Sequence, residues 1–189
     1  MALTLDGTLG LIAPAANIAG TLLVNNAAAL TTAAPQSGGV IQTIQTYSTT
    51  QISTSSSSFV TSGIALSITP KFSTSKILVH MCLGRVSGTN SVVFRILRNS
   101  SLYLSGDAAG SRPQLHTAEA NQGRDANHTG QCMFMYFDSP ASTSSQTYQV
   151  QVRPEGTYFG LNRSQNDSDG NNSYNGRASS TLILMEIAQ

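Results

Sequence analysis

The segment Gln146-Thr147-Tyr148-Gln149-Val150-Gln151-Val152 alternates polar and apolar side chains along its whole length. Alternation with a period of two is typical of a half-buried β-strand, and it places Tyr148, Val150 and Val152 on the face toward a core. The segment Val40-Ile41-Gln42-Thr43-Ile44-Gln45-Thr46-Tyr47 is also rich in β-branched residues. Both segments therefore predict strands.

Turn-forming clusters separate runs of this kind along the chain, and they include Val86 to Asn90, Asp138 to Pro140 and Asn166 to Gly176. The runs between such clusters predict about nine or ten short strands. No segment of 40–189 has the pattern of a helix of useful length. We therefore predict an all-β fold for this region, an antiparallel jelly-roll sandwich.

Three of the predicted strands are apolar on both faces rather than on one: Ile77-Leu78-Val79-His80-Met81-Cys82-Leu83, Cys132-Met133-Phe134-Met135-Tyr136-Phe137 and Leu182-Ile183-Leu184-Met185. In an antiparallel sandwich one face of each sheet normally meets water, so a second apolar face needs a second surface that buries it. We expect this surface to be a contact between subunits. The alternative is that the same chain covers these strands.

Residues 1–39 differ from the rest of the chain. Of nineteen formally charged residues only Asp6 precedes Lys71, and Ala-rich stretches are interrupted by Pro14, Gly20 and Pro35. Short Ala runs broken by Gly and Pro form at best a marginal helix in isolation. We predict a mostly irregular N-terminal extension over 1–39, which gains order against a partner, and a β-sandwich head domain over 40–189.

Composition disfavours several classes of protein. The net charge is +1 with no basic cluster, so nucleic-acid binding is not expected. Residues 1–30 carry no positive charge for a secretory signal, and the apolar run from Leu9 to Ala16 is far shorter than the roughly 20 residues that span a membrane. Cys82 and Cys132 lie inside strand-like runs, which favours two buried thiols and leaves a disulfide open.

The residues that carry chemistry form no recognisable constellation. His80, His116 and His128 lack metal-ligand spacing, and we expect a structural or interface role for His80 and a solvated loop for the other two. The acidic residues, Asp138 among them, lie mostly in predicted turns. Asp167-Ser168-Asp169-Gly170 fails as a calcium loop because Gln165 and Gly176 occupy the positions of the first and last ligands. We predict no catalytic residue, no metal site and no cofactor.

Several motifs in series give the region 40–189 a resemblance to a known group of proteins. They are Ile68-Thr69-Pro70-Lys71-Phe72-Ser73-Thr74-Ser75-Lys76-Ile77-Leu78-Val79, Phe94-Arg95-Ile96-Leu97-Arg98-Asn99, Gly106-Asp107-Ala108-Ala109-Gly110-Ser111-Arg112, Asp138-Ser139-Pro140, Tyr148-Gln149-Val150-Gln151, Leu161-Asn162-Arg163-Ser164 and Arg177-Ala178-Ser179-Ser180-Thr181. The region resembles a domain of virion structural proteins of tailed bacteriophages, especially marine and cyanobacterial ones.

This resemblance implies a trimeric jelly-roll head on a fibre, spike or capsid surface, similar in shape to tumour-necrosis-factor-like trimers. It also implies that residues 1–39 dock into another virion protein. Long fibres of this type carry an extended shaft, whereas only about 39 residues precede the head here. A short tail or neck appendage and a capsid decoration protein both fit that length.

We therefore expect a non-enzymatic homotrimer on the virion surface, made in the host cytoplasm, which contributes to host attachment. Capsid decoration is the alternative, and a glycan-binding or glycan-cleaving protein is a more remote one. Candidate intersubunit polar contacts are Arg112, Arg163 and Arg177. Candidate contacts to a host cell-surface glycan are Asn121, Asn127, Tyr158 and Asn171, although a place in the strand core is the favoured interpretation of Tyr158 and Phe159.

Overall fold

The computed structural model describes residues 23–24, 27–28, 35–103, 105–120 and 130–189. The chain divides into two compact units, Met1–Pro35 and Gln36–Gln189. In the first unit, the described residues form a short antiparallel pair of strands, β1 (Leu23–Val24) and β2 (Ala27–Ala28).

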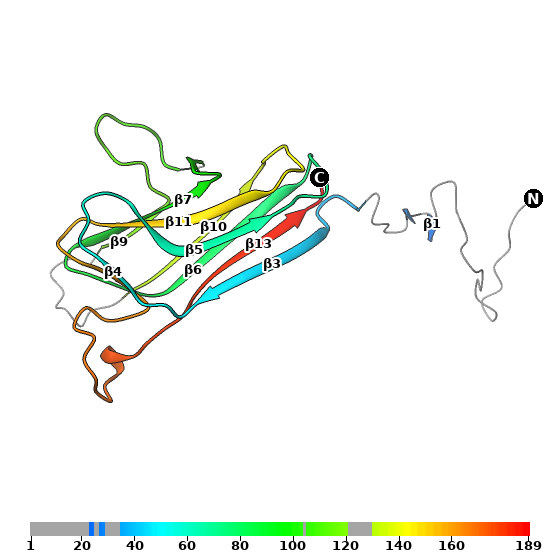
Figure 1. The fold of residues 1–189 in the computed structure, drawn as a ribbon. Helices are drawn as coiled ribbons and strands as arrows, with labels where there is room; N and C mark the ends of the chain where they lie inside the picture. The colour runs from blue at the N-terminus through cyan, green and yellow to red at the C-terminus, as the bar shows by residue number, and fades with distance from the viewer. Residues whose placement is uncertain (1–22, 25–26, 29–34, 104, 121–129) are drawn as a thin grey trace, which may run out of the picture. The chain divides into compact units, whose positions relative to one another are not determined.

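The regular secondary structure of the second unit is almost entirely β-strand (Figure 1). They are β3 (Val40–Ser48), β4 (Ile52–Thr54), β5 (Val60–Ile68), β6 (Lys76–Gly88), β7 (Ser91–Arg98), β8 (Ser101–Leu102), β9 (Thr117–Ala120), β10 (Gly130–Asp138), β11 (Gln146–Pro154), β12 (Phe159–Leu161) and β13 (Ser180–Ile187). The helical element among the described residues is a single 3-10 turn, η1 (Ser173–Asn175). These eleven strands slightly exceed the nine or ten predicted, and three of them, β4, β8 and β12, have only two or three residues.

The strands form two antiparallel sheets. In the first sheet the order is β3-β13-β6-β10. The last residues of β6 also pair with β12, and β12 pairs with β4. In the second sheet the order is β5-β11-β7, with β8 and β9 pairing along the free side of β7. The chain crosses between the sheets several times, as in a jelly roll. The predicted all-β antiparallel sandwich is confirmed.

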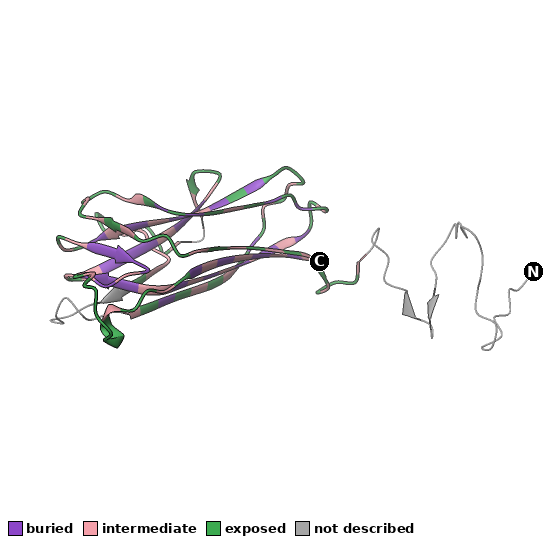
Figure 2. Cartoon of the chain, turned by 60° about the horizontal axis from the view of Figure 1, so that its bottom comes forward, coloured by how far each residue is buried: buried purple, intermediate pink, exposed green. Residues whose placement is uncertain are grey.

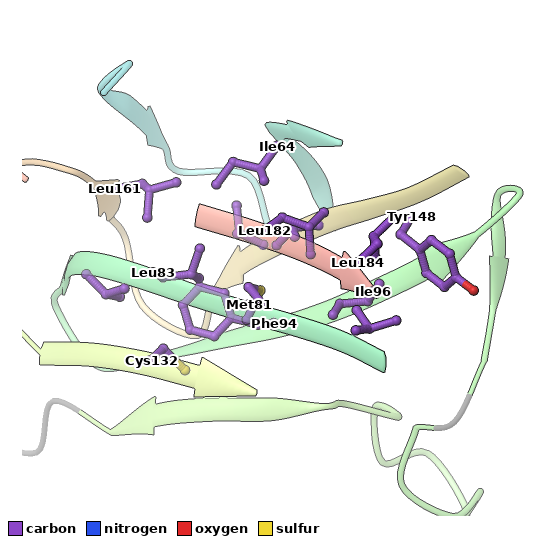
Figure 3. Packing of buried hydrophobic residues seen from close by; sticks show 14 of the residues in the cluster. Ile64, Met81, Leu83, Phe94, Ile96, Cys132, Tyr148, Leu161, Leu182 and Leu184 are labelled. Atoms are coloured by element: carbon purple, nitrogen blue, oxygen red, sulfur yellow. The ribbon is translucent and has the colours of Figure 1, made fainter. Parts of the chain in front are cut away.

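The core lies between the two sheets, where alternate residues of long strands such as β6 and β11 are buried (Figure 2). Tyr148, Val150 and Val152 are fully buried on the inner face of β11, as their alternation predicts. Figure 3 shows Met81 of β6 beside Phe94 of β7, which comes from the opposite sheet. The rings of Phe94 and Phe159 meet edge to face with their centroids 6.0 Å apart. The core therefore joins both sheets.

Two fully buried carboxylates connect loops and strands to this core. Asp138 is the last residue of β10 and accepts hydrogen bonds from Arg98 and Tyr148 of the second sheet. Glu186 of β13 accepts the backbone N–H groups of Lys71 and Phe72 at 2.8 and 3.2 Å. The assignment of Asp138 to a turn was wrong, because an ion pair across the sandwich holds this side chain inside the protein.

The two cysteines form no disulfide and lie on adjacent strands. Cys82 of β6 stands opposite Met133 of β10, whereas Cys132 stands opposite Leu83. Since successive residues of a strand point to opposite faces, the two thiols lie on opposite faces of the sheet and cannot form a disulfide with each other. Burial is confirmed for Cys132, while Cys82 is half-buried.

Candidate interaction surface

The most unusual surface of the second unit is the outer face of its first sheet, the face that points away from the sandwich core. It is built by alternate residues of β3, β13, β6 and β10. The members of this outer face are Thr43, Gln45, Tyr47, Lys76, Leu78, His80, Cys82, Gln131, Met133, Met135, Phe137, Thr181, Ile183, Met185 and Ile187.

Strand register arranges these residues in rows across the sheet. The central row runs from Met135 through His80 and Ile183 to Gln45. Residues directly opposite on antiparallel strands have their Cβ atoms about 5 Å apart, so neighbours in a row are in contact. The surface is therefore continuous across four strands.

A parallel row on one side of the central row contains Phe137, Leu78, Met185 and Thr43. On the other side, Met133, Cys82, Thr181 and Tyr47 form the third row. In all three rows the residue on β10 is apolar, while β3 contributes Gln45, Thr43 and Tyr47.

The large exposed apolar side chains of the first sheet lie on its two edge strands, with Val40 and Tyr47 on β3 and three residues on β10. Met133, Met135 and Phe137 are 61%, 64% and 54% exposed, whereas the alternate residues Phe134 and Tyr136 pack against the core. The prediction that these strands are apolar on both faces is confirmed. Within the part of the chain that the structure describes, nothing covers the outer face of β10.

The outer face is nearly uncharged. Lys76, at its end, is its one formally charged residue among the strand positions described. No carboxylate of the described strands points to this side, because Glu186 and Asp138 are buried on the inner face. His80 is half-buried at the centre of the surface, between Met135 and Ile183. An interface position, one of the two roles expected for His80, matches this location.

His116 differs from its expected place in a solvated loop. Its Nε2 lies 2.7 Å from the carbonyl oxygen of Tyr103, and its Nδ1 accepts the backbone N–H of Ile96 at 3.2 Å. The ring also meets Phe134 edge to face, with centroids 4.9 Å apart. Burial lowers the pKa of His116, and the hydrogen bond to Tyr103 offsets part of this effect. His128 lies outside the described residues.

Two of the three candidate intersubunit arginines are brought together by one carboxylate. Asp167 accepts Nη2 of Arg163 at 3.2 Å and Nη2 of Arg177 at 2.6 Å. Arg112 is exposed in a different loop, between β8 and β9. Arg163 and Arg177 therefore already have a partner within their own chain, and together they hold the loop between β12 and β13.

The candidate glycan contacts are spread over different environments. Asn171 is exposed in the loop between β12 and β13, and Asn121 and Asn127 lie outside the described residues. Tyr158 is half-buried before β12, while Phe159 is fully buried in the core, as favoured for it. Burial raises the pKa of Tyr158, although nearby Arg163 counteracts this effect.

One exposed aromatic residue that the sequence analysis did not select lies close to Asn171 in the chain. Tyr174, in η1, is 43% exposed, and its carbonyl oxygen and that of Ser173 accept hydrogen bonds from Arg85. Its position within an Asn-rich loop was the available signal. Arg85 of β6 thus ties this turn to the first sheet.

The described residues contain no group of three His, Cys, Asp or Glu side chains that could hold a metal ion. Among the same residues, no helix is long and apolar enough to cross a membrane. No protein-family model matches the chain, and no curated protein is significantly similar to it. The outer face of the first sheet is therefore the feature on which a functional proposal rests.

Proposed function

We propose that this protein is a structural protein of a bacteriophage virion, a surface-exposed homotrimeric β-sandwich anchored by residues 1–39. Its role is that of a tail or neck appendage that contributes to host attachment. The observation that carries this proposal is the exposed apolar outer face on a head with few charges. Large exposed apolar patches mark interaction sites, and the subunits of an oligomer can bind one another through such a patch.

The loop between β12 and β13 supports a role in attachment. It exposes Tyr174 together with Asn171 and Asn172, and the ion pairs of Asp167 brace it. Aromatic rings and amides on a braced loop are suited to stacking on sugars and to hydrogen bonding with their hydroxyl groups. A host cell-surface glycan is the ligand that we propose for this loop.

A capsid decoration protein is the second candidate, and one feature favours it. Residues 1–39 are rich in Ala and Leu and carry a single charge, Asp6. A cement protein needs an extended apolar arm that lies along neighbouring shell proteins, and this composition suits such an arm. In this alternative the head would stabilise the shell rather than contact the host.

Gold-labelled antibody electron microscopy on intact particles tests the proposal. Label at the tail or neck is the expected result. Label distributed over the head would replace host attachment with capsid decoration. Particles that carry no label, although the protein is detected in the infected cell, would overturn the assignment to the virion.

A further inference from the structure

We infer that the outer face of β3, β13, β6 and β10 is the surface through which copies of this chain bind one another, with the exposed side chains of β10 buried in the contact. This inference deepens the proposed homotrimer and rests on it, because it assigns the residues that join the subunits. It does not depend on where the protein lies in a virion.

The apolar side chains of the outer face form one continuous patch over three adjacent strands: Met133, Met135, Phe137, Leu78, Ile183 and Met185. This patch reaches the β10 edge of the sheet, while Gln45 and Thr43 lie beyond it toward β3, Gln131 at one end and Lys76 at the other. Depletion of charged residues within the contact patch is typical of a protein–protein interface.

The extent of the surface suits a contact between subunits. Four strands that pair over about seven residues cover a projected area of roughly 450 Å², given about 4.8 Å between strands and about 3.3 Å per residue. A specific interface takes about 800 Å² of accessible surface from each partner. Because the accessible area of a layer of side chains exceeds its projected area, this face can supply most of one subunit's share.

The charge of the surface favours a second copy over a foreign partner. A face without carboxylates and with a single lysine at its end offers no complement to a charged partner. In a cyclic trimer, different parts of this face would meet between neighbouring subunits, because such contacts are heterologous. A face with one lysine among its described positions brings little charge repulsion to that contact, and the net charge of +1 leaves little long-range repulsion between whole chains. The occupant to which these features point is another copy of the chain.

His80 lies in the central row of this face. Its neighbours across the sheet are Met135 of β10 and Ile183 of β13. Subunit contact would therefore bury this imidazole ring beside apolar side chains.

The first experiment measures the mass of the purified full-length protein by light scattering, for the wild type and for Met135→Glu. We expect the wild type to give three times the 19.8 kDa of one chain, and Met135→Glu to give one chain mass. The matched control is Ala65→Glu, at an exposed strand position on the outer face of the second sheet, which should keep the wild-type mass.

The outcomes separate this inference from the proposed homotrimer. A monomeric wild type would overturn both. A trimeric Met135→Glu protein would overturn the inference and leave the homotrimer standing, with its contact elsewhere. Circular dichroism on each variant checks that the strands are intact.

A measurement on the wild type covers the case in which Met135→Glu does not fold. Mild peroxide oxidation followed by mass spectrometry should find Met133 and Met135 as protected in the assembly as the fully buried Met81. Rapid oxidation of both in assembled protein would overturn the inference.

Discussion

At the residue scale, the buried carboxylate of Asp138 makes the strongest polar contacts across the sandwich. Its two oxygens lie 2.7 and 2.8 Å from Nη1 of Arg98, and the hydroxyl of Tyr148 donates to it at 2.7 Å. Burial, together with the hydrogen bond to Asp138, raises the pKa of Tyr148 above its ordinary value, so this hydroxyl remains a donor. One carboxylate thereby connects β10 to both β7 and β11.

Asp138→Asn should lower the free energy of unfolding by about 3 kcal/mol, since removal of one partner from a buried ion pair leaves the other charge uncompensated. Arg98 keeps some contact with water, which holds the expected loss at the lower end of the usual range. Urea unfolding measures the change. Asp169→Asn, in an exposed loop, is the matched control and should change stability by less than about 0.5 kcal/mol. Equal stability of the two variants would show that the ion pair contributes nothing net.

His116 predicts a pH dependence of stability. Its pKa is lowered from 6.5 in the folded protein, so the unfolded chain binds a proton more readily than the folded one. The contribution of neutral His116 to the free energy of unfolding is therefore complete above the ordinary pKa, and it is lost as the pH falls below that value. Urea unfolding between pH 7.5 and pH 5 should show this decline, and His116→Gln should flatten it. A variant that declines as steeply as the wild type would assign the effect to another group.

Neither of these residue roles could be predicted from the sequence. Asp138 and Arg98 are 40 positions apart, and His116 and Ile96 are 20 apart. Their roles arise from which strands become neighbours, and no local pattern carries that information. The Asp-Ser-Pro motif that begins at the last residue of β10 has the composition of a turn, and only the folded structure shows that its first residue is buried.

At the scale of the elements, the sequence predicted more. Alternation identified the inner face of β11, and the three doubly apolar runs identified β6, β10 and β13, which turn out to be adjacent in one sheet. Because the three strands are neighbours, their outward apolar residues form one continuous surface, the outer face of the first sheet. The register that puts His80 at its centre could not be predicted, since register follows from turns and from the packing of the whole sandwich.

Close packing at the junction of β6 and β13 gives a test at this scale. A Cβ atom at Gly84 would lie 1.9 Å from the carbonyl oxygen of Ser179, which is a backbone atom and cannot rotate away. Gly84→Ala should therefore displace the chain before β13 and lower the free energy of unfolding by about 3 kcal/mol or more.

Gly106→Ala is the control for that substitution. A Cβ atom there would meet its nearest neighbour, the carbonyl oxygen of Leu115, at an ordinary 3.6 Å. Thermal unfolding should leave this variant close to the wild type. If Gly84→Ala were equally well tolerated, the approach of residues 178–180 to β6 would be looser than the structure has it.

At the scale of the whole molecule, truncation can test whether folding and assembly require only the second unit. The buried residues of the sandwich all lie within Gln36–Gln189. Just before β3, the N–H of Gly38 donates to the carbonyl oxygen of Ala188, and the N–H of Ala188 donates to that of Gly39, both at 2.9 Å. Tolerance to truncation follows from the burial and hydrogen bonding of the backbone that is kept. A chain that begins at Gln36 keeps all of these contacts.

We therefore expect the protein without residues 1–35 to melt within about 2 °C of the full chain, a shift that corresponds to less than about 1 kcal/mol. It should also keep the mass of the full-length assembly, because the outer face of the first sheet remains complete. What it should lose is incorporation into particles, since the proposed anchor is absent. A truncated protein that falls to one chain mass would place the subunit contact in residues 1–35, whereas one that still enters particles would place the anchor in the sandwich itself.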